Sequence, residues 1–184
     1  LCEIMLPDSG YLNEKDAEWE NHKRERKGLA PIEPLYTLTD AEACLTTFSS
    51  VAYRESKEIA PGLTLKFHDA GHILGSSIVE LTQRVGGRSR TLVFSGDLGG
   101  RDAPVMDPPT KLSRADMVIM ESTYGDRLHR PYAETMAEIA GVFAQASARK
   151  GNILIPAFTV GRTQDLLYLM SEHYDEWNLG DWQI

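Results

Sequence analysis

The sequence contains little that would place it in a membrane or stabilise it through disulfides. It has 184 residues and only two cysteines, Cys2 and Cys44. No apolar stretch approaches the ~20 residues that a membrane-spanning helix needs, which argues against a membrane protein. Two widely separated cysteines in apolar company are typical of free core thiols in a reducing compartment. The sequence therefore predicts a cytoplasmic protein without disulfide bonds.

Positive charge is also scarce, because the formal net charge is −8 at pH 7. This balance excludes a chain-wide electrostatic attraction to nucleic acid, although it leaves room for one basic groove. A basic run occurs at Lys23, Arg24, Arg26 and Lys27. Two interpretations of this run are open: contact with an RNA backbone, or simple exposure to solvent at the end of a helix.

The chain begins with Leu1 rather than Met and carries no signal-peptide pattern. It ends in a segment typical of a strand that is just beginning. We therefore expect both ends to be cut and the chain to be a fragment. Its length is still sufficient to bury a core in one or two domains.

Hydrophobic periodicity predicts an α/β fold with a boundary near residue 122. Asn13 is expected to cap the first helix and Gly28 to end it, and a capping box at 39–42 opens the second. Gly86-Gly87 predicts a hairpin, and the continuous apolar run 117–120 predicts a strand buried on both faces. The expected helices are 13–27, 39–48, 132–146 and 162–171, and the expected strands are 63–67, 78–82, 91–95, 117–120 and 153–155.

Three polar residues follow apolar runs at regular intervals. His72, Asp97 and Glu121 stand 25 and 24 residues apart, each just past an expected strand. Hydrolytic metal sites of α/β proteins are assembled in this way, with ligands on loops at strand ends. No His-x-His pair occurs, so the ligands present are too few for a closed site.

Each residue has an alternative structural explanation. His72 suits a zinc ligand or a hydrogen-bonded loop histidine. Asp97 suits a carboxylate that bridges two metals about 3.5–4 Å apart, or an Asx turn. Glu121 would be a costly charge unless it is paired or ligating. His68 and His72 have the spacing of a helical zinc site, but Gly71 interrupts the helix, and His68 is expected to point away from the apolar face of its strand.

Together these segments resemble the metallo-β-lactamase superfamily and, within it, the β-CASP branch of nucleic-acid-processing nucleases, which includes ribonuclease J and the endonuclease of mRNA 3′-end processing. The resemblance covers essentially the whole chain and is most diagnostic at Ala70–Ser76 and Glu121–Gly125. It implies a partial αββα sandwich over residues 1–122, without its N-terminal ligand motif, and the start of an α/β β-CASP domain over 123–184. The segments 6–10, 34–37 and 156–164 also match its bacterial members.

The resemblance implies a role for each candidate residue. His72 would complete one of two zinc sites, and Asp97 would bridge both zinc ions. Glu121 would be the acidic residue of the first β-CASP motif, which orients a later catalytic histidine. In such enzymes a metal-bound hydroxide attacks a phosphodiester phosphorus.

Further residues are expected to bind the substrate. The resemblance assigns Ser122, Thr123 and Tyr124 to this role. Arg162 and Thr163 begin a helix, whose N–H groups either bind a phosphate or are merely capped by these residues. The implied partner is RNA, with single-stranded DNA as the alternative, and a homodimer is a further expectation.

The chain also departs from the family pattern. The His-x-His-x-Asp-His ligand run is absent and is expected upstream of Leu1, and the later β-CASP histidines are expected beyond Ile184. His129 and His173 are predicted to be solvated rather than to replace them. The chain alone is thus expected neither to hold two metals nor to cut RNA. The alternatives are a DNA-acting nuclease and a metal-free scaffold paralogue, against which the retention of His72 and Asp97 speaks.

Overall fold

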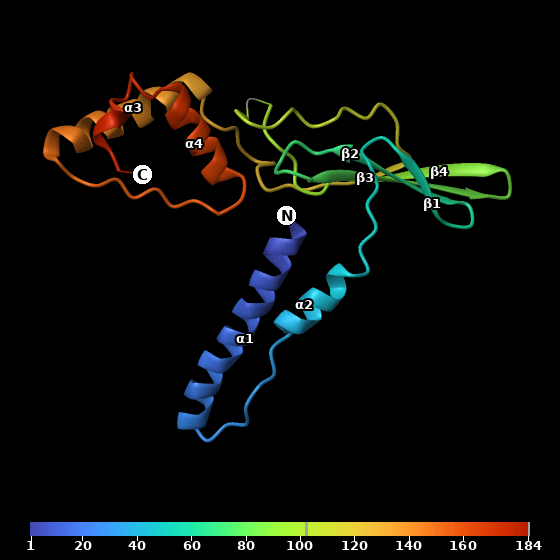
Figure 1. Ribbon diagram of the computed structural model, residues 1–184. Coiled ribbons are helices and arrows are strands. Elements are labelled where there is room, and N and C mark those ends of the chain that lie inside the picture. The colour runs from blue at the N-terminus through green and yellow to red at the C-terminus, as the bar shows by residue number, and fades with distance from the viewer. Residues whose placement is uncertain (102, 184) are drawn as a thin grey trace. The chain divides into compact units, whose positions relative to one another are not determined.

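The computed structural model describes residues 1–101 and 103–183. The chain divides into two compact units, Leu1–Ser50 and Val51–Ile184. Helices form the first unit, whereas the second contains a five-stranded sheet followed by helices (Figure 1). The α/β class expected from the sequence is therefore confirmed.

Two helices make up the first unit, α1 (Cys2–Arg26) and α2 (Leu38–Leu45). They cross at Gly10, where a Cβ would lie 2.8 Å from the Thr37 carbonyl oxygen. The connection between them is held by Asn21, whose side chain accepts a hydrogen bond from the Ile32 N–H and donates one to the Ile32 carbonyl. Close contact at a glycine and a doubly bonded asparagine thus fix the angle of this helical hairpin.

Both helices begin earlier than the sequence predicts. Asn13 is not a cap, because α1 starts at Cys2 and continues through Pro7. Pro7 lies in the second turn of α1, so it removes one intrahelical hydrogen bond without ending the helix. The capping box joins Thr37 and Asp40 rather than residues 39 and 42, and α2 ends at Leu45 rather than near 48. The segment contains two overlapping capping-box sequences, and the one that begins at Thr37 is the one that forms.

The basic run at the end of α1 makes contacts within its own unit. Lys23 Nζ lies 3.0 Å from the centroid of the Trp19 ring, and Arg24 Nε donates to the Ala30 carbonyl at 2.7 Å. These two cations are therefore partly engaged in holding the end of the helix. Contact of this run with an RNA backbone stays a prediction.

The sheet of the second unit has the strand order β1-β2-β3-β4-β5. Neighbouring strands are antiparallel except for β4 and β5, which are parallel. The hairpin at Gly86-Gly87 is confirmed: both glycines have positive φ, as a two-residue turn between twisted strands requires. The strands are β1 (Ser56–Ala60), β2 (Leu63–Asp69), β3 (Ser77–Val85), β4 (Arg88–Phe94) and β5 (Met117–Ile119).

One face of this sheet carries a small buried core. Ile78 and Val93 are about 5% exposed and pack with the fully buried Ala70 against Leu98 and Leu112, which lie in the crossover from β4 to β5. His68 pairs with Ile78 and lies on this same face, so the expectation that it points away from the apolar face is wrong, and its side chain is buried. Its Nε2 lies 2.7 Å from a carboxylate oxygen of Glu80 on β3, so the buried imidazole is paired.

Two strand predictions are wrong. The run at Met117–Met120 is not buried on both faces, since its four side chains are 51–63% exposed. It forms the edge strand β5, which pairs with β4 alone among the described residues. Residues 153–155 form no strand, and Leu154 is 93% exposed. A short apolar run becomes a strand only where a partner strand is available. The edge strand β1, conversely, was not expected, because its sequence does not alternate.

Helices α3 (Tyr132–Arg149) and α4 (Arg162–Glu172) confirm the periodic predictions for these segments. They pack together through Phe143, Leu169 and Met170 with Trp177 and Leu179. The Phe143 and Trp177 rings stack with centroids 5.5 Å apart. This is the second core of the unit, and it encloses Leu179, which is 1% exposed.

Neither cysteine lies in a core. Cys2 and Cys44 are both exposed, because they are on the helical hairpin, whose buried surface is small. Both thiols are free, and the prediction that they lie in a core is wrong. None of the helices in the described part of the chain is long and apolar enough to cross a membrane.

The burial of Leu179 gives a stability prediction. Leu179→Ala should lower the free energy of unfolding by about 2–5 kcal/mol, because the cavity left in this core cannot close completely. Leu154→Ala is the matched control, since that leucine is 93% exposed and should change stability by less than about 0.5 kcal/mol. Urea unfolding of the chain measures both. Equal midpoints for the two variants would contradict the described core.

Candidate active site

The loop that carries His72 is organised by the hydroxyl of Ser76. Ser76 Oγ accepts hydrogen bonds from the N–H groups of His72 and Ile73, at 3.0 and 3.2 Å. The Ala70 N–H donates to the Ser76 carbonyl, which closes the loop between β2 and β3. The backbone is therefore fixed from inside, while the His72 side chain is exposed.

Three loops meet at two glycines without space for side chains. The Gly99 N–H donates to the Ala70 carbonyl at 2.9 Å, and a Cβ on Gly99 would overlap the Gly71 carbonyl oxygen. Gly71 has a φ of +63° and touches the Asp107 carbonyl on its other side. This close backbone approach brings the His72 loop beside the loop that carries Asp97.

Glu121 joins the ends of β4 and β5. Its Oε1 accepts the Leu98 N–H at 2.6 Å, and its own N–H donates to Ser95 Oγ at 3.1 Å. The Ser95 N–H in turn donates to the Ile119 carbonyl. The peptide that follows Asp97 is thus held directly by the Glu121 carboxylate, whereas the Asp97 side chain is exposed.

These contacts keep Glu121 ionised. The Leu98 N–H is the largest cause that lowers the pKa of the Glu121 carboxyl, followed by a hydrogen bond from the Thr123 side chain. A charge on His72 is a smaller cause that also lowers the pKa of Glu121. His72, Asp97 and Glu121, which are distant in sequence, are thus brought to one edge of the sheet.

Arg162 and Thr163 begin α4, as predicted. The Thr163 hydroxyl donates to the Phe158 carbonyl at 2.6 Å, so this side chain caps the preceding loop. No side chain of the described residues caps the first amides of α4 itself. Gly161 lies against Ile73, since a Cβ there would be 2.8 Å from Ile73 Cγ2. The start of α4 therefore lies beside the His72 loop.

Ser122, Thr123 and Tyr124 lie in a tight turn directly after Glu121. The Ser122 carbonyl accepts the Gly125 N–H at 3.0 Å, and Tyr124 is 53% exposed. His129 is exposed, which confirms the sequence prediction, and its ring lies 4.3 Å from that of Tyr124. The turn thus presents an accessible aromatic side chain next to the Glu121 carboxylate.

The prediction of a solvated His173 is wrong. Its ring stacks on Trp177 with centroids 4.6 Å apart, and Nδ1 lies 2.7 Å from Glu176 Oε2. The side chain is 30% exposed, because it follows α4 and packs over the edge of the helical core. His173 therefore has a structural explanation that the sequence did not indicate.

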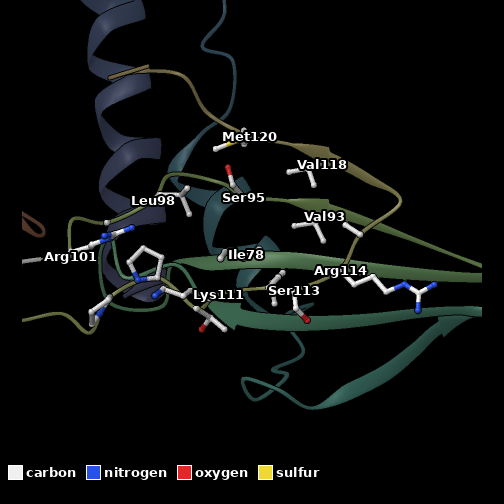
Figure 2. A pocket seen from close by; sticks show the side chains of 16 residues that line it. Ile78, Val93, Ser95, Leu98, Arg101, Lys111, Ser113, Arg114, Val118 and Met120 are labelled. Carbon is white, nitrogen blue, oxygen red and sulfur yellow. The ribbon is translucent and has the colours of Figure 1, made fainter. Parts of the chain in front are cut away.

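A cavity of about 650 Å³ lies between the sheet and the crossover segment 108–115 (Figure 2). Ile78 and Val93 line it together with the cations Arg101, Lys111 and Arg114. Ser95 and Leu98 belong to its wall, whereas none of the three candidate residues lines it. The three candidate residues therefore lie outside this cavity, and Glu121 is joined to its wall residues Ser95 and Leu98.

The donor atoms of the site do not by themselves fit a zinc ion. Zinc in proteins takes three or four nitrogen, oxygen or sulfur ligands. His72 and Asp97 offer two, and residues 1–101 and 103–183 contain no group of three His, Cys, Asp or Glu side chains that could hold a metal. No catalytic step through a metal therefore follows from these residues alone.

The groups that hold the loops of the site together are mostly backbone atoms, which sequence motifs do not reveal. The Leu98 N–H and the carbonyls of Ala70 and Ser76 carry the loop contacts, and every residue type except proline offers the same N–H. Ser95 and Ser76 bond through hydroxyls that stand next to glycines in sequence. Small polar residues beside glycines at strand ends were the available signal.

The fold and the contacts between the strand ends show an α/β protein with a polar, accessible site on the loops at the ends of its strands. No family model matches the chain. Comparison with curated proteins, however, gives clear relatives that agree with this class.

The chain is 40% identical over 141 residues to ribonuclease TTHA0252 of Thermus thermophilus, covering 77% of this chain and 32% of that protein. It is 34% identical to transcription termination factor FttA of Thermococcus kodakarensis and 33% identical to that of Methanococcus maripaludis, covering 77% of this chain and 22% of each factor. The chain thus spans a third or less of the length of these relatives. The similarity confirms the expected likeness to a ribonuclease.

The close contact at Gly99 predicts that alanine destabilises the protein at this position but not at the neighbouring Gly100. Gly99→Ala should cost about 1–3 kcal/mol of stability, because the new methyl group forces the Gly71 carbonyl to move. Gly100→Ala is the control: it has open space around its Cα and should stay within about 0.5 kcal/mol. Thermal unfolding distinguishes them, and equal stability would exclude the interlocked loops.

The hydrogen bond to Glu121 is tested at the Leu98 amide. Glu121→Ala should speed its hydrogen exchange about tenfold or more, the usual worth of a hydrogen bond to a charged group, whereas Glu121→Gln keeps an acceptor oxygen and most of the protection. The pKa of Glu121 is lowered in the folded protein, so the contact between its ionised carboxylate and the Leu98 N–H is fully present above the ordinary pKa range of glutamate. The protection of the Leu98 amide should be lost as the pH falls through the lowered pKa.

The control for this measurement is Glu134→Ala, an exposed carboxylate in the first turn of α3. It should leave exchange at Leu98 unchanged. Wild-type protection in Glu121→Ala would show that the carboxylate does not hold this peptide.

Proposed function

We propose that this chain is part of a nuclease that hydrolyses phosphodiester bonds in RNA. The observation that carries the proposal is the hydrogen bond by which Glu121 holds the peptide after Asp97, next to the backbone contact that joins the Asp97 loop to the His72 loop. Accessible polar side chains on a rigid frame of backbone contacts are typical of catalytic sites. The similarity to a protein named ribonuclease, over 77% of the chain, supports RNA as the substrate.

We further infer that the chain belongs to the β-CASP branch of the metallo-β-lactamase superfamily. The α/β fold and the named relatives support this assignment. So does the position of the diagnostic segments Ala70–Ser76 and Glu121–Gly125, which meet at one edge of the sheet. In this assignment residues 1–122 are part of the metallo-β-lactamase domain and 123–184 begin the β-CASP domain.

Within the proposal, Asp97 and Glu121 form the catalytic part of the site. Glu121 holds the loop that carries Asp97, and the Asp97 carboxylate is exposed and therefore accessible to a substrate. Arg162 and Thr163 are proposed to bind substrate phosphate at the start of α4, where amide groups without a side-chain cap attract anions. Ser122, Thr123 and Tyr124 are proposed to contact the nucleotide next to the phosphate that is cut.

Two zinc ions are proposed only for the full-length protein. His72 and Asp97 offer two donors, so further ligands must come from outside the described residues. We also place the protein in the cytoplasm, which the two exposed free thiols support. A homodimer stays a prediction.

The second candidate is a metal-free scaffold subunit. A scaffold needs no metal ligands beyond His72 and Asp97, whereas the zinc enzyme depends on further ligands from the rest of the full-length protein. Such a protein would bind its RNA or protein partners without cutting the strand. Catalysis and binding therefore have to be measured separately.

The proposal is tested with full-length protein and 5′-labelled single-stranded RNA, with and without EDTA. We expect cleavage that EDTA abolishes. Asp97→Asn should lower the rate roughly 100-fold or more, the scale of losing one catalytic group, and should lower bound zinc as well. Zinc content is measured by mass spectrometry on the same samples.

Asp175→Asn is the matched control, because it neutralises an exposed carboxylate outside the site and should leave both readings unchanged. Normal cleavage with about two zinc ions per chain in Asp97→Asn would exclude the bridging role. Cleavage of single-stranded DNA but not of RNA would show that the substrate is DNA and would overturn the proposal of an RNA substrate. Zinc-free protein that binds RNA without cutting it would establish the scaffold.

A further inference from the structure

An exposed cluster of rings and cations follows the site on the turn and loop that lead to α3. The Tyr124 and His129 rings lie 4.3 Å apart at an angle of 54°, and Arg127 Cζ lies 5.2 Å from the centre of the Tyr124 ring. All three side chains are exposed, so their mutual contacts bury little surface. Stability of the fold therefore does not account for this arrangement.

The cluster is anchored at both ends. On one side, the Gly125 N–H donates to the Ser122 carbonyl at 3.0 Å, which closes the turn that carries Tyr124. On the other side, Arg130 pairs with Glu138 of α3 at 2.7 Å. Side chains held in place before a ligand arrives lose less conformational entropy on binding.

The chemistry of the cluster suits an unpaired base. Tyrosine and histidine rings and arginine guanidinium planes are the surfaces on which single-stranded RNA bases stack. The charge is also suitable, because Arg127 adds a cation beside the Tyr124 ring in a chain of net charge −8, whereas the charge of Arg130 is offset by Glu138. The only acidic side chain within the turn, Asp126, is 83% exposed and lies 3.9 Å from Arg127, so solvent screens that pair.

We propose that Tyr124, Arg127 and His129 form a stacking platform for one unpaired base of single-stranded RNA. This inference rests on the proposed function and deepens it, because it says where the strand is held. A base stacked there would lie next to Ser122 and Thr123, which follow Glu121 in the chain. The platform would thus position the strand, without taking part in bond cleavage.

The platform is tested by binding of a fluorescein-labelled single-stranded RNA 10-mer to full-length protein in EDTA, where no cleavage interferes. Tyr124→Ala should weaken binding about tenfold, since one base stacked on an aromatic ring is worth roughly 1–3 kcal/mol. Tyr124→Phe keeps the ring and should stay within about twofold. His129→Ala should weaken binding by a smaller factor than Tyr124→Ala.

Tyr174→Ala is the matched control, because that tyrosine is equally exposed, at 51%, and lies after α4. It should bind as wild type. A duplex of the same sequence should bind more weakly than the single strand, because paired bases cannot stack on the platform. Cross-linking with 4-thiouridine RNA should label the peptide that contains Tyr124.

The outcomes separate this inference from the proposed function. If wild-type protein binds and cuts RNA while Tyr124→Ala binds equally tightly, the platform is wrong and the nuclease stands. If Tyr124→Ala weakens binding but wild-type protein never cuts RNA, the platform stands in a binding protein. If wild-type protein neither binds nor cuts RNA, both ideas are overturned.

Discussion

The hydrogen bond from the Leu98 N–H to the Glu121 carboxylate is the contact on which the strand-end site depends. It joins the loop after β4 to the residue just after β5, at 2.6 Å. β5 has three residues, all more than half exposed, so apolar burial contributes little to holding it. Polar links at its end, through Glu121 and Ser95, compensate for this shortage. Glu121, a candidate catalytic residue, therefore also holds the end of the edge strand β5 in place.

The glycines impose a second constraint on the same region. Gly71 and Gly99 let two backbones meet where any side chain would collide, so the loops of His72 and Asp97 can approach only with these residues in place. The outcome is a rigid backbone with exposed functional side chains. That combination suits a site for a large, flexible polymer, since the protein needs little reorganisation to engage it.

Local signals in the sequence predicted local structure well. The Gly86-Gly87 hairpin and helices α3 and α4 follow from turn chemistry and periodicity, and the strand ends marked by His72, Asp97 and Glu121 follow from the apolar runs before them. Exposure was predicted poorly. The apolar run at Met117–Met120 would look the same in sequence for a central strand and for an edge strand. Which of the two forms depends on whether distant residues supply a second neighbouring strand. The Leu98 contact had no sequence signature, because a backbone N–H belongs to almost every residue.

The electrostatics of Glu121 restrict what it can do. A carboxylate that accepts the Leu98 N–H and a hydrogen bond from Thr123, with a pKa below its ordinary range, is ionised at neutral pH. A general acid must instead carry its proton near the working pH, and an efficient general base has a pKa near that pH. Glu121 is therefore suited to holding the Asp97 loop and to orienting a cation or an imidazole. In the nuclease that we propose, another group would have to donate the proton to the leaving oxygen. Histidine, which changes charge near neutral pH, is the side chain best suited to that step.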